Sequence, residues 1–212
     1  MPVDICIAAF QKAVAHIRAS KDPQQQMGIT YVNIQCDETR IARLPQPLLQ
    51  AFCPELQLSR PYKIVFIESQ YLESTRLITE WMTACSEAGR IIPFTHFKEQ
   101  PYFKYALIKP AAKALKFEAL VQELNRRCIN LACRTQLHTE DVRAVYNLLP
   151  ADVEGELSHR EMASYSIYKS IKNNELKAKH AVEKLRKEIP ALDHAIRSRM
   201  KAKGSESPKA KA

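Results

Sequence analysis

Carboxylate side chains follow the first two strands that the sequence predicts. Asp37 and Glu38 come after a strand expected over 29–36, and Glu68 comes after one expected over 62–67. If these strands are parallel neighbours, the acids lie at the carboxyl edge of the sheet, where α/β proteins bind ligands and metals. Asp37 and Glu68 are thus the candidate catalytic pair of a metal-dependent hydrolase or nuclease. The plainer and favoured interpretation is that polar residues end strands because the chain turns into solvent there.

Other reactive side chains are poorly arranged for chemistry. Tyr165 and Lys169 have the spacing used by short-chain dehydrogenases, but that chemistry also needs a glycine-rich dinucleotide loop upstream, and the 4 glycines are scattered. Cys128, Cys133 and His138 follow one another at intervals that match no common zinc pattern. We therefore expect no cofactor and no metal, and we favour a protein that is not an enzyme.

The most informative pattern is an apolar stripe on a helix expected over 174–203. Pro190 interrupts this stretch, so we expect a kink or a restart there. The stripe packs either on the protein's own core or on a partner protein, and an amphipathic pattern alone gives the two equal weight. The residues of this apolar seam recur at the three-and-four spacing of a heptad repeat and are Val182, Leu185, Ile189, Leu192 and Ile196.

Positive charge is concentrated towards the C-terminus. The chain has 32 Lys and Arg against 23 Asp and Glu, for a net charge of +9. Residues 172–212 hold 12 basic and 5 acidic side chains, whereas residues 1–171 hold 20 and 18. Such a segment attracts phosphate backbones or acidic protein surfaces through the same long-range field. The candidate phosphate contacts are Lys177, Lys184, Arg186, Lys187, Arg197, Arg199, Lys201 and Lys203.

A nucleic-acid interface would need aromatic side chains beside these cations. Bases would stack on Tyr102, Phe103 and Tyr105 if a strand carrying them were exposed, although a core face explains the same alternation equally well. No helix-turn-helix, zinc-finger or ribonucleoprotein sequence is present, so sequence-specific recognition has no support.

The elements that must position these residues change character along the chain. Residues 1–135 alternate between helical and strand patterns, and residues after about 135 show helical patterns only. The expected early elements are a helix over 3–20, strands over 29–36 and 62–67 with the latter placed centrally, a short helix over 48–52, a helix over 70–88 ended by Gly89, a hairpin of strands over 90–97 and 102–108, and a helix over 111–133 opened by Pro110. The later helices are expected over 139–149, 158–172 with a Ser158–Glu161 capping box, and 174–203.

These patterns predict an α/β fold, with α+β as the alternative. Residues 1–135 should form a small mixed sheet of about four strands flanked by helices. A helical region over 136–203 and a disordered basic tail over 204–212 should follow. Single cysteines, no signal peptide and no long apolar run favour a cytoplasmic protein that does not span a membrane. We expect a non-enzymatic adaptor that docks onto another protein or complex through its C-terminal helices. The alternative is an RNA- or DNA-binding accessory protein, with a metal-dependent hydrolase as the lesser alternative.

Overall fold

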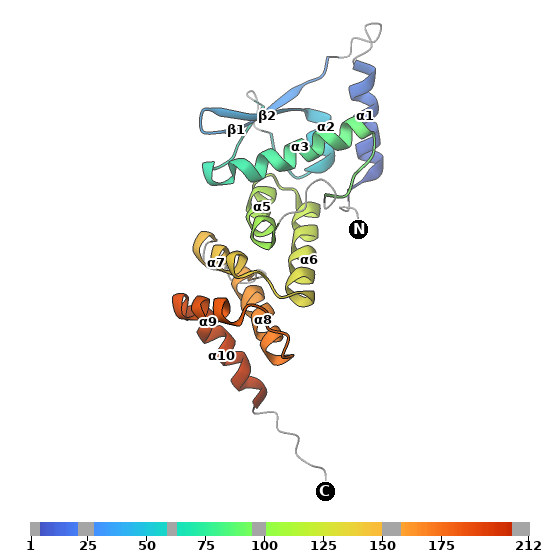
Figure 1. Ribbon diagram of the computed structural model, residues 1–212. Coiled ribbons are helices and arrows are strands. Elements are labelled where there is room, and N and C mark those ends of the chain that lie inside the picture. Colours follow the sequence, from blue (N-terminus) through green and yellow to red (C-terminus); the bar gives the residue numbers. More distant parts are fainter. Residues whose placement is uncertain (1–4, 21–27, 59–62, 95–100, 150–157, 205–212) are drawn as a thin grey trace. The chain divides into compact units, whose positions relative to one another are not determined.

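The computed structural model describes residues 5–20, 28–58, 63–94, 101–149 and 158–204 (Figure 1). The chain forms two compact units, which are described separately below. Unit 1 comprises Met1–Gln100 and Leu107–Leu124, and unit 2 comprises Pro101–Ala106 and Asn125–Ala212. Helices accompany a mixed sheet, which confirms the broad expectation of an α/β or α+β fold. The sheet has three strands in the described residues, where the sequence predicted about four.

Unit 1 contains the sheet, whose strand order is β2-β1-β3. The middle strand β1 (Tyr31–Cys36) pairs antiparallel with β2 (Thr39–Pro45) and parallel with β3 (Ile64–Phe66). Val32 and Ile34 of β1 are fully buried, while the residues between them are half-buried, as expected for a strand with one face on the core. This alternation is the signal by which the sequence correctly predicted β1.

Two of the expectations about the sheet are wrong. The apolar run over 62–67 indicated a central strand, but β3 lies at the sheet edge and the Phe66 side chain is 69% exposed. Residues 59–62 lie outside the described part of the chain. The sequence also failed to predict β2, because Arg40, Arg43 and Pro45 obscure its strand pattern. Charged residues and proline are typical of edge strands, where they discourage further pairing.

Helices α1 (Ile7–Ser20), α2 (Gln46–Phe52) and α3 (Leu72–Ala88) build the rest of this core, with α2 and α3 packed against the sheet (Figure 1). The Phe52 ring lies at its centre, with its centroid 5.6 Å from Phe10, 5.2 Å from Trp81 and 5.6 Å from Phe117. Gly89 ends α3 at φ 65°, a left-handed conformation that glycine adopts without steric cost. The expected helix over 70–88 and its glycine cap are therefore confirmed.

The predicted hairpin is replaced by a helix. Residues 102–108, expected as a strand, belong to α5 (Tyr102–Ala114), and Arg90–Pro93 are not in a strand. Residues 95–100 lie outside the described residues. Aromatic and β-branched residues led to the strand prediction, but Tyr102, Tyr105 and Ala106 are all buried at the three-and-four spacing of a helix. Burial of one helical face therefore overrides local strand propensity here.

The sequence predicted that Pro110 opens the next helix, and this is wrong. Pro110 lies inside α5. The helix ends a turn later, where the backbone N–H of Phe117 donates to the carbonyl of Ala112 at 2.9 Å and Lys116 has a φ of 53°. This is the Schellman arrangement, formed here with a lysine at the position that usually holds glycine. Helix α6 (Glu118–Arg134) then begins, later than the expected start at 111.

The C-terminal part of unit 2 is helical in the described residues, as the sequence predicts. It contains α7 (Thr139–Leu148), α8 (His159–Lys172), α9 (Lys179–Glu188) and α10 (Pro190–Gly204). The Ser158 hydroxyl accepts a 2.9 Å hydrogen bond from the backbone N–H of Glu161, which confirms the N-terminal cap of α8. The restart at Pro190 is also confirmed, because α9 ends at Glu188 and α10 begins at Pro190. Of the tail expected over 204–212, residues 205–212 lie outside the described residues.

Candidate functional site

The apolar seam faces the interior of unit 2. Val182 and Leu185 of α9 and Leu192 and Ile196 of α10 are fully buried within the chain itself, and Ile189 at the corner is half-buried. Helix α10 packs on α8, and α9 packs on α7. The seam thus stabilises the helical unit, and the exposed surface of α9 and α10 is mainly polar, with Met200 as an exposed large apolar side chain on α10.

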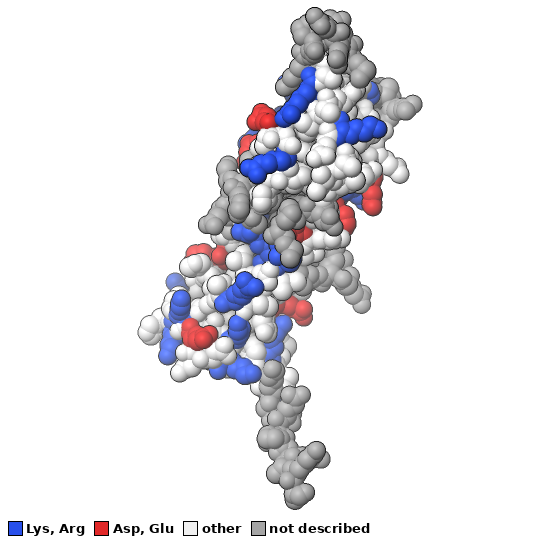
Figure 2. Space-filling model, turned by 90° about the vertical axis from the view of Figure 1, so that its right-hand side faces the viewer, with Lys and Arg blue, Asp and Glu red and all other residues white. Residues whose placement is uncertain are grey.

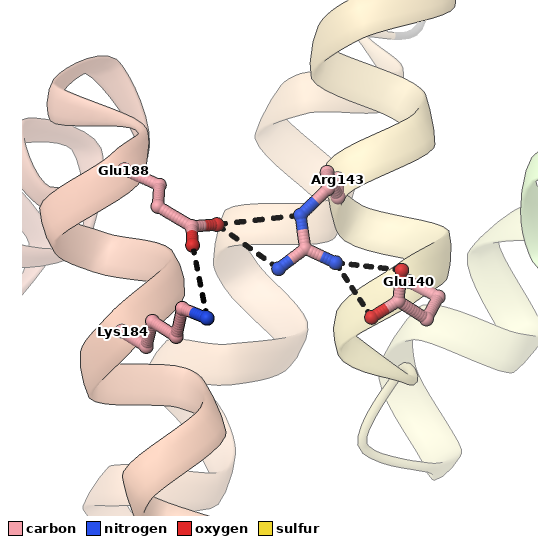
Figure 3. Close-up of polar contacts among 4 residues, drawn as sticks. All are labelled: Glu140, Arg143, Lys184 and Glu188. Atoms are coloured by element: carbon pink, nitrogen blue, oxygen red, sulfur yellow. Dashed lines mark hydrogen bonds and ion pairs between the residues drawn. The ribbon is translucent and has the colours of Figure 1, made fainter.

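An ion-pair network on this surface joins α7 to α9 (Figure 3). The Arg143 guanidinium donates to Glu140 at 2.6 Å and to Glu188 at 3.0 Å, and the Lys184 ammonium lies 3.9 Å from Glu188. Hydrogen bonding to Arg143, together with its positive charge, lowers the pKa of the Glu140 carboxyl. Arg143 therefore bridges two carboxylates from different helices, which is more geometric constraint than an isolated surface pair provides.

A second cluster lies at the corner between α9 and α10. Oδ1 of Asp193 accepts a 2.7 Å hydrogen bond from Nε–H of Arg186. Oδ2 of Asp193 lies 2.7 Å from Nε of Arg197. These three side chains, with Glu183 and Lys187, line an open hollow of about 300 Å³. Two guanidinium groups are therefore held beside a solvent-accessible hollow by one shared carboxylate.

Arg199, another candidate phosphate contact, points inward. Its guanidinium donates to the Ser164 hydroxyl at 2.8 Å and to the carbonyl of Ala195 at 3.4 Å, which joins α10 to α8. The side chain of Lys203 lies outside the described residues. Arg199 is thus a packing residue of unit 2.

Five lysines of α8, α9, α10 and the connection between α8 and α9 are exposed, and their ammonium groups have no acceptor among the residues that the structure describes. Figure 2 shows Lys and Arg side chains spread over this part of the molecule, with Asp and Glu side chains between them. The outer surface is therefore a mosaic of both signs in which the uncompensated charge is positive. We call these residues the surface lysines: Lys172, Lys177, Lys179, Lys187 and Lys201.

Two of the three aromatic residues considered for base stacking, Tyr102 and Tyr105, belong to the core. Tyr102 and Tyr105 are buried, and the Arg127 guanidinium lies 4.5 Å from the centroid of the Tyr105 ring. The Tyr102 hydroxyl lies 3.3 Å from Nδ1 of His159. The segment is helical rather than an alternating strand, so Tyr102 and Tyr105 are not available to nucleic acid, whereas Phe103 is half-buried with the Lys104 ammonium 5.4 Å from its ring centroid.

The carboxylates of the hydrolase alternative do follow neighbouring strands. Strands β1 and β3 are parallel, so Asp37 and Glu68 follow them at the same edge of the sheet. Asp37 adopts a φ of 51° in the tight turn to β2, and Glu68 accepts a hydrogen bond from Gln70. Within the described ranges, no three His, Cys, Asp or Glu side chains are grouped to hold a metal. The geometry therefore adds nothing to the catalytic interpretation beyond this shared edge.

Tyr165 and Lys169 likewise have structural partners. The Lys169 ammonium donates to the carbonyl of Cys133 near the end of α6, and the Tyr165 ring lies 6.4 Å from that of Tyr168. Cys128 is buried and Cys133 is exposed. These contacts support packing and helix capping as the roles of this part of α8.

Sequence reasoning missed the acids that organise the surface, although part of the signal was present. Glu140 precedes Arg143 by three positions and Asp193 precedes Arg197 by four, which are helix-pair spacings. The pairing of Arg186 with Asp193 spans Pro190 and depends on the corner angle, which sequence spacing does not give.

Comparison with protein-family models, curated proteins and solved structures returned no match to this chain. In the described part of the molecule, no helix is both long and apolar enough to cross a membrane.

Proposed function

We propose that this chain is a non-enzymatic binding protein whose C-terminal helical unit docks onto an acidic surface of a partner protein. The observation that carries the proposal is the set of surface lysines. They are exposed on α8, α9, α10 and the connection between α8 and α9 and have no acceptor among the described residues, whereas the apolar seam is buried except for the half-buried Ile189. A rigid helical unit with uncompensated positive charge attracts and orients an acidic partner.

The charge pattern favours protein over nucleic acid as the partner. Glu183, Glu188 and Asp193 lie among the cations, so the surface presents both signs and lacks the continuous positive track that a phosphate backbone favours. No Phe, Tyr or Trp follows Tyr168 in the chain, so α9 and α10 offer only the imidazole rings of His180 and His194 for base stacking. A protein surface can match the mosaic with charges of its own.

Charge reversal on the full chain tests the proposal. The variant combines Lys179→Glu, Lys187→Glu and Lys201→Glu. The matched control makes the same change in net charge on unit 1, with Lys12→Glu, Arg40→Glu and Arg90→Glu, all of which are exposed. Each immobilised chain is exposed to nuclease-treated lysate at about 0.05 M and 0.5 M salt, and captured proteins are identified and titrated.

Wild type and control should retain the same acidic protein, and the C-terminal variant should bind it about threefold to a hundredfold more weakly, since exposed pairs contribute ~0.2–1 kcal/mol each. Binding should weaken at high salt because exposed charges are screened beyond about 8 Å at physiological ionic strength. Equal capture by all three chains would contradict the proposal. Capture that depends on nuclease-sensitive material would assign the surface to nucleic acid instead.

A further inference from the structure

The corner between α9 and α10 holds two arginines in a fixed relation. Nε and Nη2 of Arg186 lie 2.7 and 2.6 Å from Oδ1 of Asp193, and Nε of Arg197 lies 2.7 Å from Oδ2. The backbone N–H of Asp193 donates to the carbonyl of Ile189, which holds the aspartate in the first turn of α10. Because Arg186 and Asp193 are both largely shielded from solvent, this pair is more ordered than an exposed ion pair.

Most of the guanidinium donors at this corner remain unused. A guanidinium carries five N–H bonds. The Nε–H of Arg186 donates to Asp193, Nη2 of Arg186 and Nε of Arg197 lie within ion-pair distance of the same carboxylate, and the described residues supply no further acceptor to either side chain. Lys187 lines the same hollow of about 300 Å³ and also has no acceptor in the described part of the chain. Three cations therefore border one open space with many free donors.

We propose that this corner binds a phosphate monoester, carried as a phosphorylated side chain by the partner protein. The inference rests on the proposed docking function and names the group that the docked partner presents. The lining residues carry three positive charges against the two negative charges of Glu183 and Asp193. Asp193 already accepts from two guanidinium groups, so an incoming anion competes with it little for the remaining donors.

The number of donors favours a phosphate monoester over other anions. A phosphate monoester has three terminal oxygens and a charge of about −1.5 to −2 at neutral pH, so it can accept from both arginines and Lys187 together. A carboxylate has two oxygens and a single charge, and a phosphodiester has two free oxygens and a single charge. Each therefore brings less negative charge and fewer acceptor positions to the three cations than a phosphate monoester does.

Binding of small probes to the full chain tests the site. Inorganic phosphate and a phosphoserine peptide are titrated into wild type and the Arg197→Gln variant, with backbone amide shifts as the readout. Arg197 is the informative choice because its side chain is 67% exposed, so its loss should leave the fold intact. The matched control is Lys184→Gln, which removes one positive charge from an equally exposed position on α9 outside the hollow.

Wild type should bind both probes, with shifts centred on α9 and α10. Arg197→Gln should weaken binding at least about fivefold, Lys184→Gln less than about twofold, and Glu183→Gln should strengthen it. The same peptide with glutamate in place of phosphoserine should bind at least about fivefold more weakly. Equal losses in Arg197→Gln and Lys184→Gln, or equal binding of both peptides, would overturn the site.

Failure of this inference and failure of the docking function are distinguishable. If partner capture survives Arg197→Gln and phosphatase treatment of the lysate, the docking function stands and the phosphate site is wrong. If phosphate binds at the corner but reversal of the surface lysines leaves partner capture unchanged, the site stands and the docking function is wrong.

Discussion

Two neighbouring acids in the first turn of α7 show how environment separates chemically similar side chains. Glu140 is exposed and accepts two hydrogen bonds from Arg143. Asp141 is buried and lies 3.4 Å from the backbone N–H of Phe103, near the start of α5. Hydrogen bonding to Arg143 lowers the pKa of the Glu140 carboxyl, whereas burial raises the pKa of the Asp141 carboxyl, partly offset by the backbone N–H of Phe103.

These shifts predict that Asp141 loses its proton above the ordinary aspartate pKa of 3.8 and Glu140 below the ordinary glutamate pKa of 4.5. The contribution of Asp141 to stability is therefore complete at low pH and falls as pH rises through its raised pKa. The contribution of Glu140 is complete above the ordinary value and falls as pH drops through its lowered pKa. Carboxyl carbon shifts followed by NMR between pH 2 and 7 measure both.

The Arg143→Gln variant is the control for the causes of these two pKa shifts. It should return the Glu140 pKa towards the ordinary value and leave Asp141 unchanged, because burial and not Arg143 determines the Asp141 shift. If Asp141 titrates below 3.8 or Glu140 above 4.5 in wild type, or if Arg143→Gln shifts both pKa values equally, the described environments of these residues are wrong.

At the scale of whole elements, capped helices and the alternating strand β1 could be predicted from sequence. Strand β2 and the first part of helix α5 could not. The helix ending at Gly89 and the cap at Ser158 depend on a few adjacent residues, so local pattern is enough. Strand β2 and helix α5 depend on tertiary partners: β2 is stabilised by pairing with β1 despite its arginines, and α5 by burial of Tyr102 and Tyr105. Local propensity therefore predicted no element at β2 and a strand over 102–108, the first part of α5.

The candidate site also has features that are visible in the sequence and features that depend on packing. The excess of cations and the apolar seam are visible in the sequence, because both are properties of a single helical stretch. Which side of that stretch faces solvent depends on α7 and α8, which pack against it. The contacts of Asp193 with Arg186 and Arg197 depend on the corner at Pro190. Sequence thus indicated the surface but not the groups that organise it.

The burial of the seam makes a prediction about stability. Leu192→Ala should lower the free energy of unfolding by about 2–5 kcal/mol, because Leu192 is 0% exposed and its removal leaves a cavity. The same substitution at Leu148, which is 61% exposed on α7, should cost less than about 0.5 kcal/mol. Urea unfolding followed by circular dichroism measures both changes. Equal and small effects would mean that the seam is exposed to solvent and free for a partner.

Across the whole molecule, the cysteines are distributed so that each unit reports on its own folding. Unit 1 has Cys6 exposed and Cys36, Cys53 and Cys85 buried. Unit 2 has Cys133 exposed and Cys128 buried. Burial raises the pKa of the Cys85 thiol to about 11 and raises that of Cys53 further still. Because the thiolate is the reactive form, the buried thiols should react only when their unit opens.

Titration of the native protein with a thiol-reactive dye should therefore show rapid reaction of Cys6 and Cys133 alone, with all six thiols reacting in denaturant. Mass spectrometry of the labelled peptides identifies the sites. In the Leu192→Ala variant, labelling of Cys128 should accelerate, because the substitution destabilises unit 2, while labelling of Cys53 should keep its wild-type rate. Equal acceleration at both would show that the two units open together, and no acceleration at Cys128 would show that the seam does not stabilise unit 2.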